Sequence, residues 1–148
     1  MRPVATLVLL ASEGEARLTE NRKKGEGLIQ IGFLSADDFA DVDQGFTEAP
    51  GRMSAAPGMG GHAFTPRESE RDARRTAFAG HILEALTKAW DKGNHDRLII
   101  AAPPRLLGEL RDRISRPIAA ALTADLPKDL VKVPLKDLPA HFNDIAAF

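Results

Sequence analysis

Arginine side chains gather in one part of the chain, where their number and spacing could serve phosphate binding. The first turns of a predicted helix contain four of them: Arg67, Arg71, Arg74 and Arg75. Guanidinium groups donate paired hydrogen bonds to phosphate oxygens, so one interpretation is a phosphate-binding stripe. Acidic residues are interspersed among the arginines. This mixture favours the alternative interpretation, a solvated face whose charges pair with one another.

A second candidate is the long segment of residues 35–65. It holds four aspartates and then a run rich in Gly, Pro, Met and Ala, without the period of a helix or a strand. A loop of about 30 residues inside a compact domain is uncommon, and is usually either functional or disordered. Its candidate functional residues are Arg52, Gly60, Gly61 and His62. The glycines could cradle an anion, although a flexible surface loop is the simpler interpretation.

Familiar catalytic and metal-binding patterns are missing from the sequence. There is no cysteine, and the HExxH, GxSxG, phosphate-loop and GxGxxG motifs are absent. The aspartates of DDFADVDQG do not follow the calcium-loop spacing, and His81 and His95 have no second ligand at zinc spacing. We therefore predict no metal and no cofactor, and the sequence identifies no catalytic residue.

Composition narrows the class of protein further. With 20 Lys and Arg against 21 Asp and Glu, the chain is nearly neutral, so we expect no DNA partner. No apolar stretch approaches the roughly 20 residues that a membrane span requires. The length of 148 residues predicts a single domain, residues 1–148. The lack of cysteine fits a reducing compartment, so we expect a cytoplasmic protein.

The stretch RLIIAAPPRLLGELRDRISR fixes the predicted fold class. Its apolar run, residues 98–102, is typical of a strand that is covered on both faces. Pro103 and Pro104 end this strand, and Pro104 can open a helix. Apolar residues then recur at helical spacing until Pro117, with Arg105 on the polar side as a further candidate for phosphate contact. A strand that leads directly into a helix is a unit of α/β folds.

The remaining elements follow from periodicity and capping signals. Strands are predicted at Val4–Leu10, Ala16–Glu20, Leu28–Leu34 and Ile118–Leu126, and helices at Thr65–Lys92 and Pro134–Phe142. For the last strand the alternative is a continued helix, because IAAALTADL is rich in alanine. The second strand is expected to have one wetter face, and the third to place Ile29, Ile31 and Phe33 on one face. The order β-β-β-α-β-α-β-α predicts a three-layer, ribonuclease H-like α/β fold. Its five-stranded mixed sheet has helices on both faces, with the second strand antiparallel to the others.

Several segments resemble the bacterial host attachment protein family. They are RLIIAAPPRLLGELR, ADLPKDL, VLLASEGEAR and GGHAFTP, which together extend over nearly the whole chain. That family is similar to a stand-alone middle domain of the archaeal and eukaryotic class I release factors and of Pelota. In release factors, a loop carries Gly-Gly-Gln into the peptidyl transferase centre of the ribosome. The resemblance implies a comparable place for Gly60-Gly61-His62.

Three functions follow as expectations. The first is a non-enzymatic, cytoplasmic binding protein of the host attachment family, which affects attachment indirectly through an unknown partner. The second is a factor that associates with the ribosome or tRNA through residues 52–62, with the arginines of the predicted helix and Arg105 on phosphate. The third is a hydrolase of unknown substrate centred on His62.

Overall fold

The computed structural model describes residues 3–42 and 66–148. Its strands are β1 (Thr6–Ala11), β2 (Glu15–Asn21), β3 (Ile29–Ser35), β4 (Arg97–Ala101) and β5 (Leu122–Leu126). Its helices are η1 (Ala36–Asp38), α3 (Pro66–Gly93), α4 (Pro104–Arg113), α5 (Arg116–Ala121), η2 (Leu135–Asp137) and α6 (Leu138–His141). The predicted order of strands and helices is confirmed, apart from the additional short helices η1, α5 and η2.

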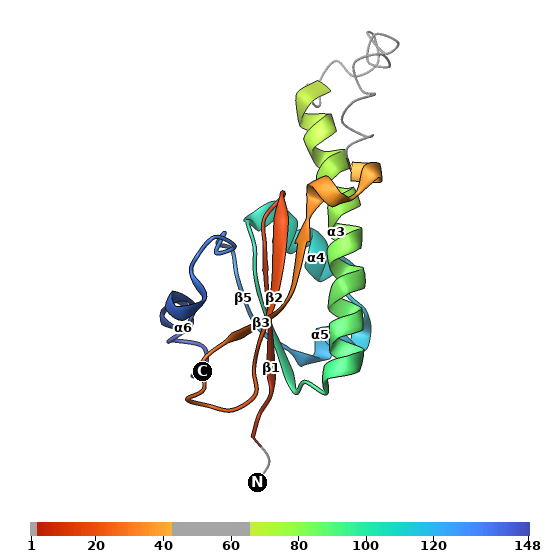
Figure 1. Cartoon of the computed structure of the whole chain (residues 1–148). Helices are drawn as coiled ribbons and strands as arrows, with labels where there is room; N and C mark the ends of the chain where they lie inside the picture. The colour runs from red at the N-terminus through yellow and green to blue at the C-terminus, as the bar shows by residue number, and fades with distance from the viewer. Residues whose placement is uncertain (1–2, 43–65) are drawn as a thin grey trace.

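The five strands form one mixed sheet in the order β3-β2-β1-β4-β5 (Figure 1). Strand β1 pairs in parallel with β4, and β4 with β5, whereas β2 is antiparallel to both of its neighbours. This arrangement is the predicted one, with only the second strand reversed. The α/β class with a five-stranded mixed sheet is therefore confirmed, while the narrower ribonuclease H-like assignment stays a prediction.

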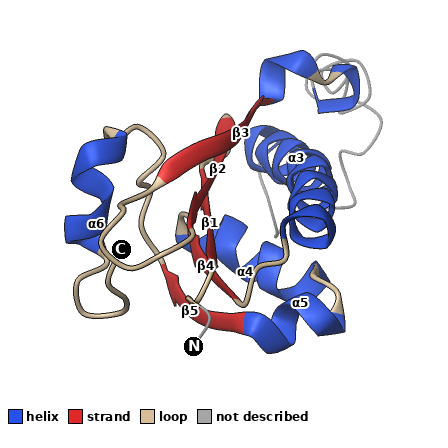
Figure 2. Cartoon of the chain, turned by 60° about the horizontal axis from the view of Figure 1, so that its bottom comes forward, coloured by secondary structure: helices blue, strands red, loops and turns tan. Residues whose placement is uncertain are grey.

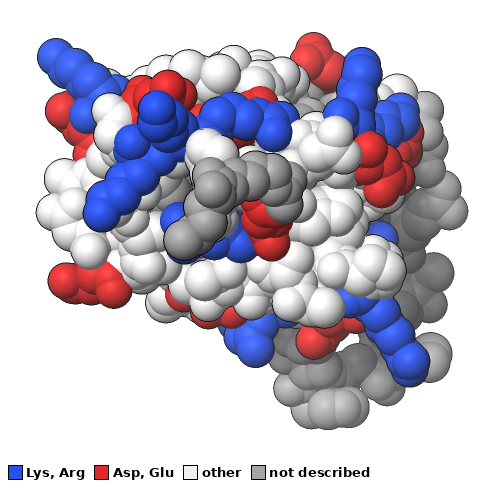
Figure 3. All heavy atoms as spheres, turned by 90° about the horizontal axis from the view of Figure 1, so that it is seen from below, with Lys and Arg blue, Asp and Glu red and all other residues white. Residues whose placement is uncertain are grey.

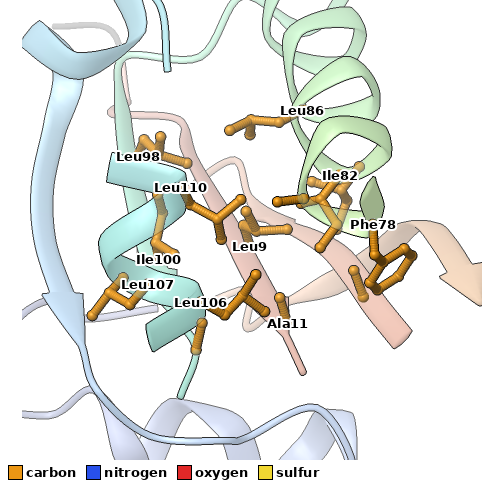
Figure 4. Packing of buried hydrophobic residues seen from close by; sticks show 14 of the residues in the cluster. Leu9, Ala11, Phe78, Ile82, Leu86, Leu98, Ile100, Leu106, Leu107 and Leu110 are labelled. Carbon is orange, nitrogen blue, oxygen red and sulfur yellow. The ribbon is translucent and has the colours of Figure 1, made fainter. Parts of the chain in front are cut away.

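Helices cover both faces of the sheet (Figure 2). Side chains alternate along a strand, so β1 contributes to two hydrophobic cores, one on each face of the sheet. Leu7 and Leu9 face α3 and α4, while Val8 and Leu10 face α6. Figure 4 shows the larger core, in which Phe78 and other side chains of α3 pack against β1 and against the leucines of α4. This packing holds α3 and α4 firmly on one face of the sheet.

Strand β2 has no solvent-exposed face, so the prediction that one of its faces meets water is wrong. Its residues from Ala16 to Asn21 are all buried. The guanidinium of Arg17 donates through Nη1 to the carbonyls of Val131 (3.0 Å) and Val133 (2.6 Å), and through Nε to Oε1 of Gln30 (2.9 Å). The carboxyl-terminal segment therefore lies over the face that was expected to meet water.

Strand β3 does not keep its apolar residues on one face, because a β-bulge interrupts its pairing with β2 between Leu18 and Thr19. Ile29 lies opposite Glu20, whereas Phe33 lies opposite Arg17. Since Glu20 and Arg17 are three residues apart on a regular strand, they point to opposite faces. The extra residue of the bulge reverses the alternation that the sequence indicated.

Only the second half of the predicted fifth strand, Ile118–Leu126, forms a strand. Residues 116–121 form α5, and β5 begins only at Leu122. Pro117 lies in the first turn of α5, where a missing N–H costs nothing, and the alanines that follow are good helix formers. Pro117 therefore follows the end of α4 and also helps to start the next helix.

Within the predicted loop of residues 35–65, the structure describes only the beginning. Ala36–Asp38 forms the single turn η1, capped by the Ser35 hydroxyl, which accepts from the Asp37 N–H at 3.3 Å. Ala36 and Val42 are buried in the larger core. Residues 35–42 are therefore attached to the folded domain.

Candidate functional site

Helix α3 is much longer than the sheet that it covers. Its 28 residues span about 42 Å, whereas the six residues of β1 span about 20 Å. From Arg67 onward, the first buried side chain in α3 is that of Arg75, so the residues before it precede the part that packs on the domain. Figure 1 shows this amino-terminal part of α3 extending beyond the sheet. We call residues 66–74 the overhang.

The overhang carries three of the arginines that the sequence indicated. Arg67 and Arg71 are exposed, and they lie one helical turn apart. Arg74 is half-buried and engaged with other groups of the protein. Of the predicted phosphate contacts on α3, Arg67 and Arg71 are therefore the two that are exposed.

Arg75 occupies a different environment, because it is only 7% exposed. Its Nη1 donates to Oδ1 of Asp72 at 2.7 Å, and its Nε lies 3.4 Å from Oε2 of Glu13. Burial alone would lower the pKa of Arg75, but hydrogen bonds and charge from Asp72 and Glu13 outweigh burial and raise it. Glu13 follows β1, so this cluster attaches α3 to the carboxyl end of the central strand.

A groove of about 770 Å³ lies between α3 and the start of α4. Its charged lining residues are Asp72, Arg75, Arg105, Glu109, Asp112 and Arg113. The three cationic side chains are balanced by three carboxylates, and Arg105, whose side chain is 73% exposed, lies 4.0 Å from Asp72. The groove thus unites two predicted phosphate contacts, Arg75 and Arg105, but without a net positive charge.

Helices α3 and α4 are held together beside this groove. Arg113 donates through Nη1 to the carbonyl of Thr76 at 3.0 Å and lies 3.4 Å from Glu109 on its own helix. A Cβ at Gly80 would lie 3.3 Å from Nη2 of Arg113, so the glycine makes room for the arginine to reach across α3. This contact therefore holds α3 and α4 together along one side of the groove.

A histidine–aspartate pair lies where α3 meets the segment after β3. Nε2 of His81 is 2.7 Å from Oδ1 of Asp41, and the His81 ring stacks on Phe39 with centroids 3.8 Å apart. The hydrogen bond with His81 lowers the pKa of Asp41. Sequence reasoning missed this pair, because its partners are 40 residues apart and Asp41 looked like solvated loop charge.

The other predicted site residues lie outside the described residues: Arg52, Gly60, Gly61 and His62. Within residues 3–42 and 66–148, no group of His, Asp and Glu side chains could hold a metal ion. In the same ranges, no helix combines the length and apolar character needed to cross a membrane. The described part of α3 therefore offers exposed arginines that are interspersed with acidic residues.

Family comparison relates this geometry to known proteins. The model of the bacterial archaeo-eukaryotic release factor family 12 matches residues 5–142. The chain belongs to this family. The match confirms the predicted likeness to a release-factor domain and gives no support to a function in host attachment.

Solved structures share the fold of this family member at low sequence identity. A non-polymerisable ParM mutant gives a TM-score of 0.51 at 12% identity, covering 96% of this chain and 48% of that one. An archaeal protein gives 0.50 at 14%, covering 96% and 34%. The archaeal translation termination factor aRF1 gives 0.47 at 15%, covering 90% and 32%. The chain thus spans about a third of the length of these two archaeal structures, and no curated protein matches it.

Proposed function

We propose that the protein is a cytoplasmic factor of the release-factor type, which associates with the ribosome or with ribosome-bound tRNA. The observation that carries this proposal is the family match over residues 5–142. The overhang supports it, because it presents the exposed arginines Arg67 and Arg71 on a helix end that projects from the sheet, although acidic residues lie between them.

Arg67 and Arg71 act as the first phosphate contacts in this proposal. Both are exposed on the overhang, whereas Arg75 is already committed to Asp72 and Glu13. In sequence, Gly60-Gly61-His62 ends four residues before Pro66, where α3 begins. The candidate residues Gly60, Gly61 and His62 are therefore near neighbours of the overhang in sequence, and the proposal includes them, with Arg52, among the residues to test.

Sedimentation of the protein with bacterial ribosomes tests the proposal. The wild-type chain should pellet with ribosomes at low salt and be released as salt is raised, because each phosphate contact displaces counterions. The double variant Arg67→Glu/Arg71→Glu should lose most of this binding. Its matched control, Lys128→Glu/Lys136→Glu, makes the same charge change at two exposed positions away from α3 and should bind as the wild type does.

Two outcomes would contradict the proposal. One is the failure of the wild-type chain to pellet with ribosomes, with or without bound tRNA, at low salt. The other is equal loss of binding in the arginine and the lysine variants, which would indicate a general charge effect. A further variant, with residues 52–62 replaced by a glycine-serine linker, measures whether the loop contributes to binding.

No described contact favours the hydrolase hypothesis centred on His62, which stays a prediction. His62→Ala tests it directly in an assay of peptidyl-tRNA hydrolysis on ribosomes. Unchanged turnover in this variant would remove His62 from any catalytic role, while leaving the binding proposal untouched.

A further inference from the structure

A second pocket lies at the opposite end of the molecule from the overhang. It has a volume of about 470 Å³ and lies where β1 and β4 begin and β2 ends. Three of its described lining residues are cationic, Lys23, Lys24 and Arg97, and none is acidic. In a chain with a formal net charge of −1, three positive side chains around one pocket create a local positive potential.

The cations of this pocket are held by the fold. Arg97 donates through Nε to the Thr6 hydroxyl at 2.6 Å, which fixes its guanidinium at the end of the sheet where β1 and β4 begin. Asn21 donates through Nδ2 to the carbonyls of Lys23 (2.9 Å) and Gly27 (2.7 Å), which closes the turn that presents the lysines. Gly27 has a φ of +75°, a conformation that favours glycine. The turn is therefore preorganised for a ligand.

Within residues 3–42 and 66–148, no carboxylate forms an ion pair with Lys23, Lys24 or Arg97. Two nearby acids have other partners: Glu20 binds Arg22 at 2.6 Å, and Asp96 accepts from the N–H of Ala5 at 2.8 Å. A third acid, Glu26, belongs to the same turn as the lysines, where its backbone N–H donates to the Lys23 carbonyl at 3.1 Å. Figure 3 looks onto this end of the molecule, where both basic and acidic side chains are visible.

One wall of the pocket is apolar. Pro3, Val4 and Ala147 form it, and Val4 is 51% exposed although it is a large aliphatic residue. An apolar surface beside preorganised cations suits a ligand with a flat, weakly polar part and an anionic part.

We propose that this pocket binds a nucleotide, with the phosphate groups on Lys23, Lys24 and Arg97 and the base against the apolar wall. The nucleotide can be free or part of an RNA strand, because the phosphate chemistry is the same in both. The inference does not depend on the proposed function, since the pocket and the overhang lie at opposite ends of the domain (Figure 1).

Calorimetric titration of the full chain with ADP, inorganic pyrophosphate and a short single-stranded RNA tests the proposal. The variant Lys23→Gln/Lys24→Gln should weaken binding of ADP or of the RNA at least tenfold. For the RNA, it should also make the slope of log K against log salt shallower, by about 0.7 for each phosphate that the variant no longer neutralises. The control Lys128→Gln/Lys136→Gln removes the same charge elsewhere and should bind as the wild type does.

The probes distinguish the two sources of phosphate. Lysine-dependent binding of both ADP and RNA supports a free nucleotide as ligand, and lysine-dependent binding of RNA alone supports a strand. A second variant, Arg97→Lys, keeps the charge but loses the forked geometry, and should weaken the same probes while circular dichroism reports an intact fold. Failure of every probe to bind at about 1 mM would overturn the proposal, as would equal affinity of the wild type and Lys23→Gln/Lys24→Gln.

Discussion

Asp72→Asn should change stability and RNA binding in opposite directions. The carboxylate of Asp72 is 2.7 Å from Nη1 of Arg75 and 4.0 Å from Nη1 of Arg105. Asparagine keeps the shape and one acceptor oxygen but removes the negative charge. The buried Arg75 then retains only Glu13 as a charged partner. The same change leaves Arg105 free of its neighbouring carboxylate, and so makes the groove more positive.

The size of both effects follows from the geometry. Replacing a charged acceptor by a neutral one should cost about 1 kcal/mol of unfolding free energy, because the Asp72 side chain is 38% exposed and its pairing is partly screened. In a domain of this size, that loss lowers the melting temperature by about 3 °C. A carboxylate about 7 Å from a bound phosphate costs about 0.6 kcal/mol in water. Its removal should therefore tighten RNA binding about threefold.

Urea denaturation and RNA titration measure the two effects on the same preparation. Asp144→Asn is the matched control, since it removes the same charge from an exposed position near α6. It should leave stability within about 0.5 kcal/mol of the wild type and leave RNA affinity unchanged. If Asp72→Asn lowers stability without tightening RNA binding, the groove side of α3 does not contact phosphate. If stability does not fall, the account of Arg75 is wrong.

Three further predictions concern the fold. Phe78→Ala removes a fully buried ring and should cost about 3–5 kcal/mol in urea denaturation, and a loss below about 1 kcal/mol would contradict the core described. Burial, and then the charge of Arg22, lower the pKa of His95, so the unfolded chain binds a proton first as pH falls. The stabilisation from neutral His95 should be complete above about pH 6.5 and be lost toward lower pH, and His95→Gln should make the pH profile of stability flatter than that of the wild type. Gly27→Ala places a Cβ at a φ of +75° and should lower stability by about 1 kcal/mol, whereas an unchanged melting curve would argue against this turn.

The order and direction of the strands could be predicted because the relevant signals are local. The apolar run at residues 98–102, followed by Pro103 and Pro104, has the same meaning in any α/β fold, and the structure places β4 and α4 there. The right-handedness of crossovers then leaves few ways to arrange the strands. Arginines could likewise be assigned to the start of α3 from capping signals alone.

The remaining features depend on contacts between distant residues. Local alternation placed Ile29 and Phe33 on one face, and nothing in the sequence marks the bulge that separates them. Asp41 finds His81 only when the segment after β3 packs on α3. Arg75 resembles Arg71 in sequence, yet it is buried because α3 reaches the sheet at that turn and Glu13 lies beside it. Tertiary packing decides each of these outcomes.

Site-directed cleavage of ribosomal RNA tests ribosome association most directly. The chain contains no cysteine, so Ser69→Cys and Lys136→Cys each introduce a single attachment point for a tethered iron chelate, and both positions are exposed. The account predicts cleavage of ribosomal RNA or bound tRNA from position 69 on the overhang and little from position 136. Cleavage of equal strength from both positions, or from neither, would contradict the claim that α3 faces the ribosome.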